Sequence, residues 1–459
     1  MKTLNIVSAT LLLAATTTAQ WATITPTTSP LGRGGMAMAY NPGTGNTIMF
    51  GGDTLGFPAG TVNETWSYDG SDWTLLTPTA SPAARAGIKI AYDVAGGVMV
   101  MYGGGPPGFF GGPATDETWT FDGTTWTQVF PTTTPGGLVL YSMTYDIARS
   151  RTVVYGGQPD TFFPIDSDKT WEWNGTDWTE IVGANQPGPL ERAAMCYHSG
   201  IARTVMFGGI DPQTGGVNTV WLFDGTAWTA APITGTAPVA RTGAVMSYDD
   251  TTDLIVMSGG QDFTNGTPYN DTWHLNLTTN TWAMSPSTRA NAHLDGGQVY
   301  DSVRQKTVGF GGYNFQTFVA YDTTEEYGAT KSTFGTGCAG SNGTPALDSN
   351  GAPRLGSTFD LNATNIATAA NLAVFAQSLS SVAPIALDPI GMIGCTAYVA
   401  PTVLTSVTGT AGSATLSITL PSTAALVGTV LNSQVLSFDP NINARWLTAS
   451  NGHTGTLGL

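Results

Sequence analysis

Residues 47–52 read TIMFGG, and this short pattern recurs five more times along the chain. The later copies read VMVMYGG (98–104), TVVYGG (152–157), TVMFGG (204–209), LIVMSGG (254–260) and TVGFGG (307–312). The glycine pairs begin at Gly51, Gly103, Gly156, Gly208, Gly259 and Gly311, so their separations stay between 51 and 53 residues. A period this regular is typical of a repeat architecture in which each copy forms one supersecondary unit.

Each copy has the pattern of four antiparallel strands. A tyrosine stands eleven residues before every glycine pair and marks a turn between two strands: Tyr40, Tyr92, Tyr145, Tyr197, Tyr248 and Tyr300. Two tryptophans follow the glycines, seven residues apart in four copies and nine in the fifth: Trp66/Trp73, Trp119/Trp126, Trp171/Trp178, Trp221/Trp228 and Trp273/Trp282. Asp-Gly or Asn-Gly lies between the tryptophans of the first four pairs, as tight hairpin turns favour.

A four-stranded sheet has two faces to cover, and copies arranged around an axis cover both. The sequence therefore predicts an all-β fold, a six-bladed β-propeller. The sixth copy runs TVGFGGYNFQTFVAYD and then stops, with no third-strand tryptophan and no fourth strand. The missing strand is predicted at the other end of the chain, because Trp21 precedes Arg33 by the same twelve residues that separate Trp73 from Arg85.

The repeats resemble the kelch repeat from Trp21 to Tyr327. The resemblance rests on a strand that begins PxxRxG, the tyrosine, the glycine pair and DTWHLNLTTNTW at 271–282. The sequence departs from the pattern at Leu138 and His293, which replace the first-strand arginine, and in the fourth copy the nearest arginine, Arg192, stands two positions late. The resemblance implies a propeller but no single function, since such folds serve binding proteins and enzymes alike.

Galactose oxidases are kelch-like copper enzymes, and the resemblance raises the question of a copper site. The predicted propeller contains only His198, His274 and His293 and a single cysteine, Cys196, which reads as a buried, inert thiol. His198 and His274 fall at different levels of different blades, so the copper ligands of galactose oxidases are not carried over to this sequence. The sequence predicts no metal and no cofactor, although loop carboxylates of the kind present here also suit Ca²⁺.

Composition and the chain start indicate an exported protein. The formal net charge is −16 with 16 scattered Lys and Arg, which argues against nucleic acid as a partner. Lys2 precedes an apolar stretch that ends LLLAA at Ala15, and small residues suited to cleavage follow near Ala19, as in a secretory signal peptide at residues 1–20. We expect a secreted or cell-surface protein without a transmembrane segment in the mature chain.

The predicted domains are a propeller at 21–327, a linker at 328–337 and a C-terminal β-sandwich at 338–459. Strand-like stretches broken by Gly, Pro and Asn predict the sandwich, and GTGCAGS with PRLGSTF resembles a C-terminal domain of many exported bacterial proteins. Cys338 and Cys395 both lie in this last part and are expected to form a disulfide with each other.

The loops between second and third strands are expected to share one face of the propeller with the links between blades. They are rich in aromatic residues, which commonly mark a partner surface or a carbohydrate-stacking platform. The ligand-binding candidates are Phe57, Phe109, Phe110, Phe162, Phe163, Phe263, Tyr269, Tyr313 and Phe315, together with Arg33, Arg85, Arg241 and His293 at the starts of first strands. The alternatives are that the rings pack on each other or are covered by the C-terminal domain, and that the arginines pair with loop carboxylates such as Asp53, Asp116 or Asp262.

The leading hypothesis is a secreted, non-catalytic binding protein that recognises a glycan or an extracellular protein through this aromatic face. The first rival is a kelch-type carbohydrate-active enzyme such as a galactose oxidase-like oxidoreductase, and the second is a structural cell-surface or matrix component. The sequence carries no nucleophile elbow, phosphate loop, HExxH motif or paired-cysteine motif, and no catalytic residues are predicted.

Overall fold

The structure is a computed structural model of the chain. It describes residues 21–457 except for 56–59, 106–113, 160–166, 184, 212, 329, 335–336, 351, 355, 369–370, 380, 388–391, 393–394, 400, 421–428 and 441–446. Every regular element in these ranges is a β-strand. They contain no helix that could serve as a membrane span. The chain divides into two compact units, with Trp21 to Gly328 forming one and the chain after Gly328 contributing to the other.

The first unit contains six four-stranded antiparallel sheets, as the repeats predict. Blade 1 consists of β2 (Ala37–Asn41), β3 (Asn46–Phe50), β4 (Thr65–Tyr68) and β5 (Trp73–Leu76). Blade 2 consists of β6 (Lys89–Asp93), β7 (Val98–Tyr102), β8 (Thr118–Phe121) and β9 (Trp126–Val129). Blade 3 consists of β10 (Ser142–Asp146), β11 (Arg151–Tyr155), β12 (Thr170–Trp173) and β13 (Trp178–Ile181).

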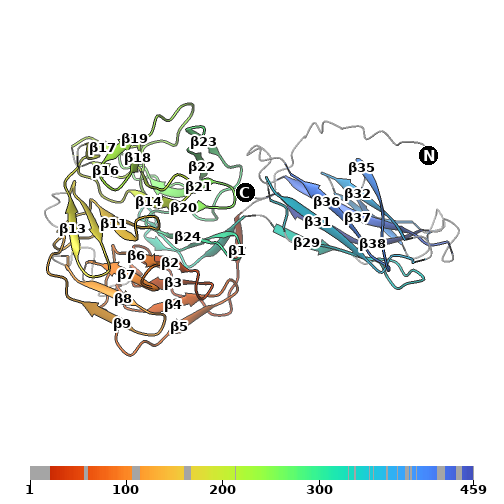
Figure 1. Ribbon diagram of the computed structural model, residues 1–459, viewed down its shortest axis with the longest axis horizontal. Helices are drawn as coiled ribbons and strands as arrows, with labels where there is room; N and C mark the ends of the chain where they lie inside the picture. The colour runs from red at the N-terminus through yellow and green to blue at the C-terminus, as the bar shows by residue number, and fades with distance from the viewer. Residues whose placement is uncertain are drawn as a thin grey trace. The chain divides into compact units, whose positions relative to one another are not determined.

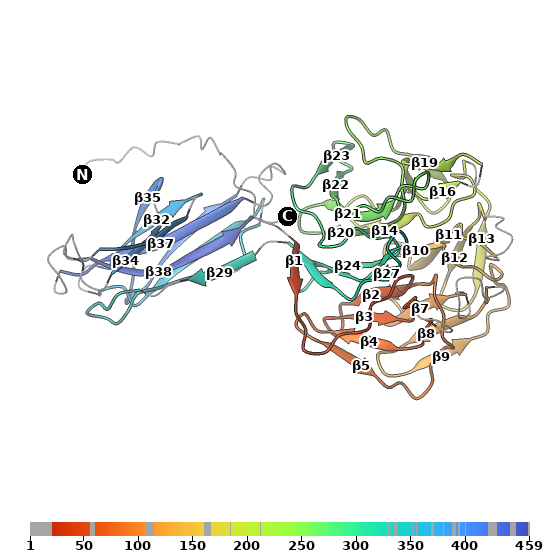
Figure 2. The same ribbon diagram turned by 180° about the vertical axis from the view of Figure 1, so that it is seen from behind.

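Blade 4 consists of β14 (Ala194–His198), β15 (Arg203–Phe207), β18 (Val220–Phe223) and β19 (Trp228–Ala230), with the hairpin β16 (Ile210–Asp211) and β17 (Gly215–Gly216) inserted. Blade 5 consists of β20 (Thr242–Asp249), β21 (Leu254–Gln261), β22 (Thr272–Asn276) and β23 (Thr281–Met284). Blade 6 consists of β24 (Gly297–Asp301), β25 (Lys306–Phe310), β28 (Thr324–Tyr327) and β1 (Trp21–Ile24), with the hairpin β26 (Tyr313–Asn314) and β27 (Val319–Ala320) inserted. The sheets surround a common centre (Figures 1 and 2).

The N-terminal strand completes the sixth sheet. β1 pairs antiparallel with β28, and Trp21 lies opposite Tyr327. The predicted closure is therefore present. The third strand begins at Thr324, and the stretch before it forms the β26–β27 hairpin. In the other five blades the second residue of the third strand is a tryptophan, and in four of them a threonine precedes it. Blade 6 keeps the threonine, Thr324, but has Glu325 in place of the tryptophan.

The glycine pairs link neighbouring blades through the backbone. Both glycines of each pair have positive φ, for example 67° at Gly51 and 99° at Gly52, which is a conformation that glycine adopts without strain. The amide of Gly52 donates to the carbonyl of Arg85 in the next blade at 3.0 Å, and that of Gly312 donates to Arg33 at 2.8 Å across the closure. A Cβ on Gly51 would lie 2.6 Å from the Arg85 carbonyl oxygen, so a larger residue would push the blades apart.

Fourth-strand tryptophans provide a second link between blades. In five blades the indole Nε1 donates to the threonine that begins the third strand of the preceding blade, at 2.8–2.9 Å: Trp73 to Thr324, Trp126 to Thr65, Trp178 to Thr118, Trp228 to Thr170 and Trp21 to Thr272. Trp21 thus makes the same bond as the other fourth-strand tryptophans, which identifies it as the fourth-strand residue of blade 6.

The link between blades 4 and 5 lacks this hydrogen bond. Blade 4 has Val220 at the threonine position, and the buried Nε1 of Trp282 has no hydrogen-bond partner. We expect Val220→Thr to raise the free energy of unfolding by about 0.5–1.5 kcal/mol, because the near-isosteric hydroxyl would accept from the indole. Urea titration followed by tryptophan fluorescence measures the change. The same substitution in a Trp282→Phe background should give no gain, and a gain there would contradict this explanation.

Within its described residues, the second unit contains three antiparallel sheets (Figure 1). Five strands lie in the order β29 (Thr330–Phe334), β38 (Leu447–Thr456), β37 (Val430–Phe438), β32 (Leu372–Ser378) and β35 (Val403–Thr408). Three lie in the order β30 (Ala346–Ser349), β31 (Thr358–Thr364) and β36 (Ala414–Thr419), and two are β33 (Ser381–Ala386) and β34 (Thr396–Val399). β29 falls inside the range predicted as a linker, so that boundary was wrong. Its pairing with β38 places it within the domain.

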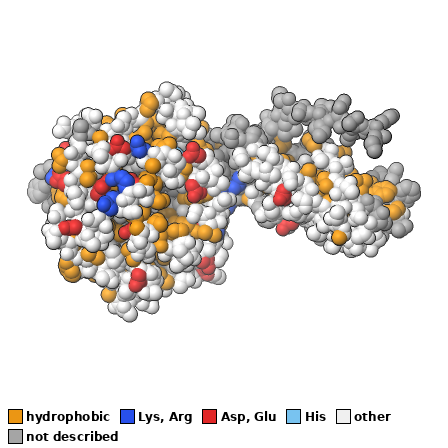
Figure 3. Space-filling model, in the orientation of Figure 1, with side chains coloured by type: hydrophobic (Ala, Val, Ile, Leu, Met, Phe, Trp, Pro, Cys, Tyr) orange, Lys and Arg blue, Asp and Glu red, His pale blue; other side chains and the backbone are white. Residues whose placement is uncertain are grey.

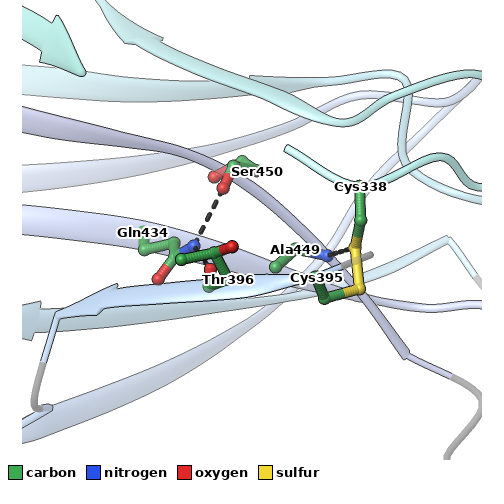
Figure 4. The surroundings of a disulfide bond; sticks show 6 residues. All are labelled: Cys338, Cys395, Thr396, Gln434, Ala449 and Ser450. Carbon is green, nitrogen blue, oxygen red and sulfur yellow. Dashed lines mark hydrogen bonds between the residues drawn. A yellow bond between two sulfur atoms is a disulfide. The ribbon is translucent and has the colours of Figure 1, made fainter. Parts of the chain in front are cut away.

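A disulfide joins Cys338 and Cys395 in this unit (Figure 4). It lies in a small apolar cluster, and the Cys338 Sγ accepts the amide proton of Ala449 at 3.1 Å. Nearby, the Gln434 side chain donates to the carbonyl of Thr396 at 2.8 Å and to that of Ser450 at 2.9 Å. The disulfide and the side-chain amide of Gln434 thus connect β34 and the segment before β30 to the long strands β37 and β38.

Candidate functional site

The propeller has two ends, which we name by the connections that they carry. The loop face carries the loops between second and third strands and the links from one blade to the next. The turn face carries the tight turns between first and second strands and between third and fourth strands. The predicted ligand-binding residues that the structure describes belong to loop-face segments.

The first-strand arginines are buried and bound within the protein. Arg33 is fully buried and donates to the carbonyls of Leu31 and Gly51 and to a carboxylate oxygen of Glu64 at 2.6 Å. Arg85 and Arg241 are also buried, and they pair in the same way with Glu117 and Asp271. The expectation that these arginines meet a ligand at the channel mouth therefore conflicts with the structure.

The carboxylates that pair with these arginines were also misassigned. The alternative to ligand binding named loop carboxylates such as Asp53, Asp116 or Asp262 as partners, whereas the acids used are Glu64, Glu117 and Asp271, two residues before the third-strand tryptophans. Each acid also accepts from that tryptophan's indole at 2.7–2.9 Å.

In blades 1, 2 and 5 one carboxylate thus holds an arginine and a tryptophan together. Burial acts to raise the pKa of Glu64, but the bonds from Trp66 and Arg33 outweigh it, and its pKa is lowered. The sequence carried a signal for this pairing. Blades 3 and 4, which lack the first-strand arginine at this position, also lack the acid, having Lys169 and Thr219 there.

Blade 6 contains a different buried ion pair, which sequence reasoning missed. Arg289 and Glu325 have side-chain exposures of 1% and 2%, and the Nε of Arg289 donates to Glu325 at 2.9 Å. His293 is fully enclosed beside them, with its Nε2 2.9 Å from an Arg289 nitrogen. Burial first, and then the Arg289 charge, hold the pKa of His293 well below its ordinary value, so the imidazole is neutral and not a surface ligand-binding group.

Gly309 makes room for this ion pair. The equivalent residues of the other second strands are Met or Val, and a Cβ on Gly309 would lie 2.8 Å from an Arg289 nitrogen. The glycine in TVGFGG, the missing tryptophan and the buried arginine are therefore parts of one arrangement. Its role is structural, because the guanidinium also lies 5.2 Å from the Trp21 ring that closes the propeller.

The predicted aromatic loop residues fall into three groups. Phe57, Phe109, Phe110, Phe162 and Phe163 lie outside the described residues. Tyr313 is buried and donates to the carbonyl of Gly34 at 2.7 Å, and Phe315 stacks on it with ring centroids 5.1 Å apart. Phe263 is 51% exposed, and Tyr269 is half-buried with Arg241 under its ring at 4.3 Å.

Two loops of the loop face lie side by side at blades 5 and 6. A methyl group on Gly266, in the β21–β22 loop, would lie 4.0 Å from the side-chain nitrogen of Gln316 in the β26–β27 hairpin. That hairpin presents Phe318, whose 80% exposure was not foreseen, and Val319 at 39%. Phe263, in the β21–β22 loop, lies toward the blade 4 hairpin, where a Cβ on Gly215 would be 3.6 Å from its ring. We call the exposed apolar side chains of these two loops, Phe263, Phe318 and Val319, the blade 5–6 patch.

The loop-face end of the central channel is closed by a ring of backbone hydrogen bonds. The six residues that follow the first-strand arginine position by two all have positive φ: Gly35, Gly87, Leu140, Arg192, Gly243 and Asp295. Each donates its amide proton to the carbonyl of the one before it, and Gly35 donates to Asp295, at distances of 2.7–2.9 Å. Arg192 and Asp295 also pair through their side chains at 2.8 Å. Arg192 is thus a ring residue, which explains why it stands two positions late.

Three cavities succeed one another along the axis and shrink toward this ring. The cavity at the turn face measures about 320 Å³, the next about 80 Å³ and the one at the ring about 20 Å³. Charged side chains are sparse on the face shown in Figure 3, and a group of them lies near the middle of the propeller. The accessible end of the channel is therefore the turn-face mouth.

The described residues contain no group of three or more His, Cys, Asp and Glu side chains placed to hold a metal ion. Burial raises the pKa of the Cys196 thiol far above its ordinary value, as the sequence suggested for an inert cysteine. His274 is buried and lies 2.7 Å from the Tyr327 hydroxyl, and burial lowers its pKa to about 4. His274 is thus held inside a blade and is not a surface group.

Comparisons with known proteins agree with this geometry. The family model described as the KLHDC2/KLHL20/DRC7 Kelch-repeats domain matches residues 142–335. A solved structure titled "Structure of YjhT" is similar with a TM-score of 0.50 and 12% identity, covering 65% of this chain and 95% of that one. A comparison with curated protein sequences gives no match. Six sheets with shared inter-blade bonds, a kelch family match and this structural likeness lead to one conclusion: the first unit of the chain is a kelch-repeat β-propeller.

Proposed function

We propose that the protein is exported and acts as a non-catalytic binding protein that holds an extracellular protein through its loop face. The observation that carries the proposal is the blade 5–6 patch, where Phe263 and Phe318 expose 51% and 80% of their surface on neighbouring loops. Exposed aromatic side chains on neighbouring loops of one face are typical anchors of protein interfaces.

The remaining loop-face candidates support a binding role through their positions. Arg33, Arg85 and Arg241 hold the blades in shape, so they provide a rigid base for the loops above them. Loops mounted on a rigid scaffold are where binding residues commonly lie. Export is supported by the N-terminal pattern and by the Cys338–Cys395 disulfide, because disulfides persist in oxidising compartments.

A glycan is the second candidate ligand, because one half-buried aromatic side chain of the loop face stands beside polar groups. Tyr269 lies near Asp262, which accepts from Thr264 and from the side chain of Asn265. A ring face beside hydroxyl, amide and carboxylate groups suits a sugar. This site lies in the same loop as Phe263, and loss of glycan binding in Tyr269→Ser would assign a sugar to it.

The test compares Phe263→Ser/Phe318→Ser with Phe130→Ser, a matched control that is also 80% exposed but follows the outer strand of blade 2. Immobilised proteins are incubated with extracellular proteins of the producing cells and, separately, on a glycan array. We expect a partner retained by the wild type to bind the double variant at least about tenfold more weakly and the control unchanged. Equal retention by all three proteins on both supports would contradict the proposal.

A further inference from the structure

The turn-face mouth of the channel is lined by the six repeat tyrosines. They are the penultimate residues of the first strands and surround the cavity of about 320 Å³: Tyr40, Tyr92, Tyr145, Tyr197, Tyr248 and Tyr300. This mouth lies at the opposite end of the strands from the loop face, so it is separate from the binding surface proposed above. A cavity of this size suits a small molecule.

Tyrosine hydroxyls at the mouth are used between blades. The Tyr145 hydroxyl accepts the amide proton of Ala95 in the preceding blade at 3.3 Å, and the Tyr300 hydroxyl lies 2.9 Å from that of Thr251. Tyr248 donates to Asp253 at 2.8 Å, and its ring stacks on His198 with centroids 4.0 Å apart. These bonds fix the rings around the axis, where the tyrosines line the cavity.

The deeper wall and the rim of the cavity differ in polarity. Methionines lie one layer below the tyrosines, at Met38, Met143, Met195 and Met246. At the rim, blades 1–3 contribute Pro42, Val94 and Ile147, whereas blades 4–6 contribute Ser199, Asp250 and Ser302. A ligand in this mouth therefore meets apolar groups on one half of the rim and hydroxyls with a carboxylate on the other.

Charge at the mouth favours a cation. Of the described residues that line the cavity, Asp250 alone is charged, and it is exposed. Arg149 and Arg304 belong to nearby turns, but they pair with Glu172 and Glu326 of their own blades. Their guanidinium groups lie over the rings of Phe223 and Tyr68 in the neighbouring blades. Aromatic rings and one carboxylate thus line the cavity, and Arg149 and Arg304 are engaged elsewhere.

We propose that the turn-face mouth binds a small organic cation that carries a methylated ammonium group. Such a group is attracted to the electron-rich faces of tyrosine rings, and its methyl groups also contact methionine and valine side chains favourably. The negative charge of Asp250 adds a further attraction. An anion would lack a counter-charge here, and a sugar would find several of the tyrosine hydroxyls already bound.

The first experiment titrates the full mature chain with choline and with 3,3-dimethylbutan-1-ol, its neutral isostere, by calorimetry. Because the two molecules share shape and apolar surface, the comparison isolates the charge. We expect saturable choline binding that is at least about tenfold tighter than binding of the alcohol. Equal affinity of the two compounds, or no saturable binding of choline, would overturn the proposal.

Variants locate the site. Asp250→Asn should weaken choline binding about threefold to tenfold, whereas Asp322→Asn, the same change at an exposed loop-face position, should not alter it. Tyr92→Leu should weaken binding by more than Tyr92→Phe, because phenylalanine keeps the ring face. Thermal melting confirms that each variant is folded. Binding that is unchanged in both Asp250→Asn and a folded Tyr92→Leu would show that the cation binds elsewhere.

The methylated ammonium can belong to a free molecule or to a lipid headgroup, and sedimentation with phosphatidylcholine vesicles separates these sources. Recruitment to the vesicles that free choline reverses would assign the site to the headgroup. Choline binding without recruitment would assign it to a free cation. The variants of the blade 5–6 patch should bind choline as the wild type does, so failure of the proposed loop-face function leaves this test intact.

Discussion

Replacing Glu325 by alanine is expected to lower the free energy of unfolding of the propeller by about 3–5 kcal/mol. Arg289 and Glu325 are both almost wholly buried, and Glu325 also accepts the amide proton of Ala290 at 2.7 Å. Removal of the carboxylate leaves the Arg289 charge without its partner inside the protein. The uncompensated charge, more than the lost attraction itself, makes the expected effect large.

Urea titration followed by tryptophan fluorescence measures this effect, because Trp446 is the sole tryptophan that lies outside the propeller. Arg289→Met/Glu325→Leu, which removes both charges, should be much more stable than Glu325→Ala alone. Asp322→Ala, an exposed acid in the segment just before β28, is the control and should change stability by less than about 0.5 kcal/mol. A loss in Glu325→Ala no larger than in this control would contradict the assigned role.

The fold was predictable because its signals are repeated. One glycine pair in a hydrophobic strand is weak evidence, but six pairs at a constant spacing left few alternatives. The closure by Trp21 was predictable for the same reason, since its distance from Arg33 copied that of Trp73 from Arg85. The structure adds the physical basis, which is the indole bond to Thr272.

The candidate site was less predictable, because a sequence shows residue types but not where charges are neutralised. Arg33 looked like a ligand-binding residue at the channel, yet its partner Glu64 is 31 residues away and lies beside it only after the blade folds. The hydrogen-bonded ring that closes the channel was also hidden. It depends on backbone conformation, and Leu140 and Asp295 adopt positive φ there without being glycine.

The blade 6 cluster shows how a departure from the repeat could have been used. Gly309 and Glu325 each break the pattern of the other copies, and together they fit the guanidinium of Arg289. Taken alone, neither departure from the repeat indicates which residue it contacts. A comparison of corresponding positions among the six copies would have brought them together.

Loss of the Trp21 side chain is the second large effect that we expect. Trp21 is 5% exposed, packs on Tyr327 with centroids 5.0 Å apart and bonds Thr272 through its indole. Trp21→Ala should therefore destabilise the propeller by about 3–5 kcal/mol, as truncation of a buried aromatic residue does. It should also loosen β1, because the ring contact with Tyr327 and the indole bond to Thr272 are lost and only backbone bonds of Trp21, such as that to the Ser287 hydroxyl at 2.8 Å, remain. A loss below about 1 kcal/mol in urea titration would contradict this.

Hydrogen exchange measures the closure most directly, because it reports on the backbone pairing of β1 in the unmodified protein. The central claim is that the ring of six sheets is sealed by Trp21–Ile24 pairing with Thr324–Tyr327. We predict that the amides of residues 21–24 are protected as strongly as those of β5 and β9, the fourth strands of blades 1 and 2. Exchange of residues 21–24 at the rate of an unstructured peptide, while β5 and β9 stay protected, would contradict the claim.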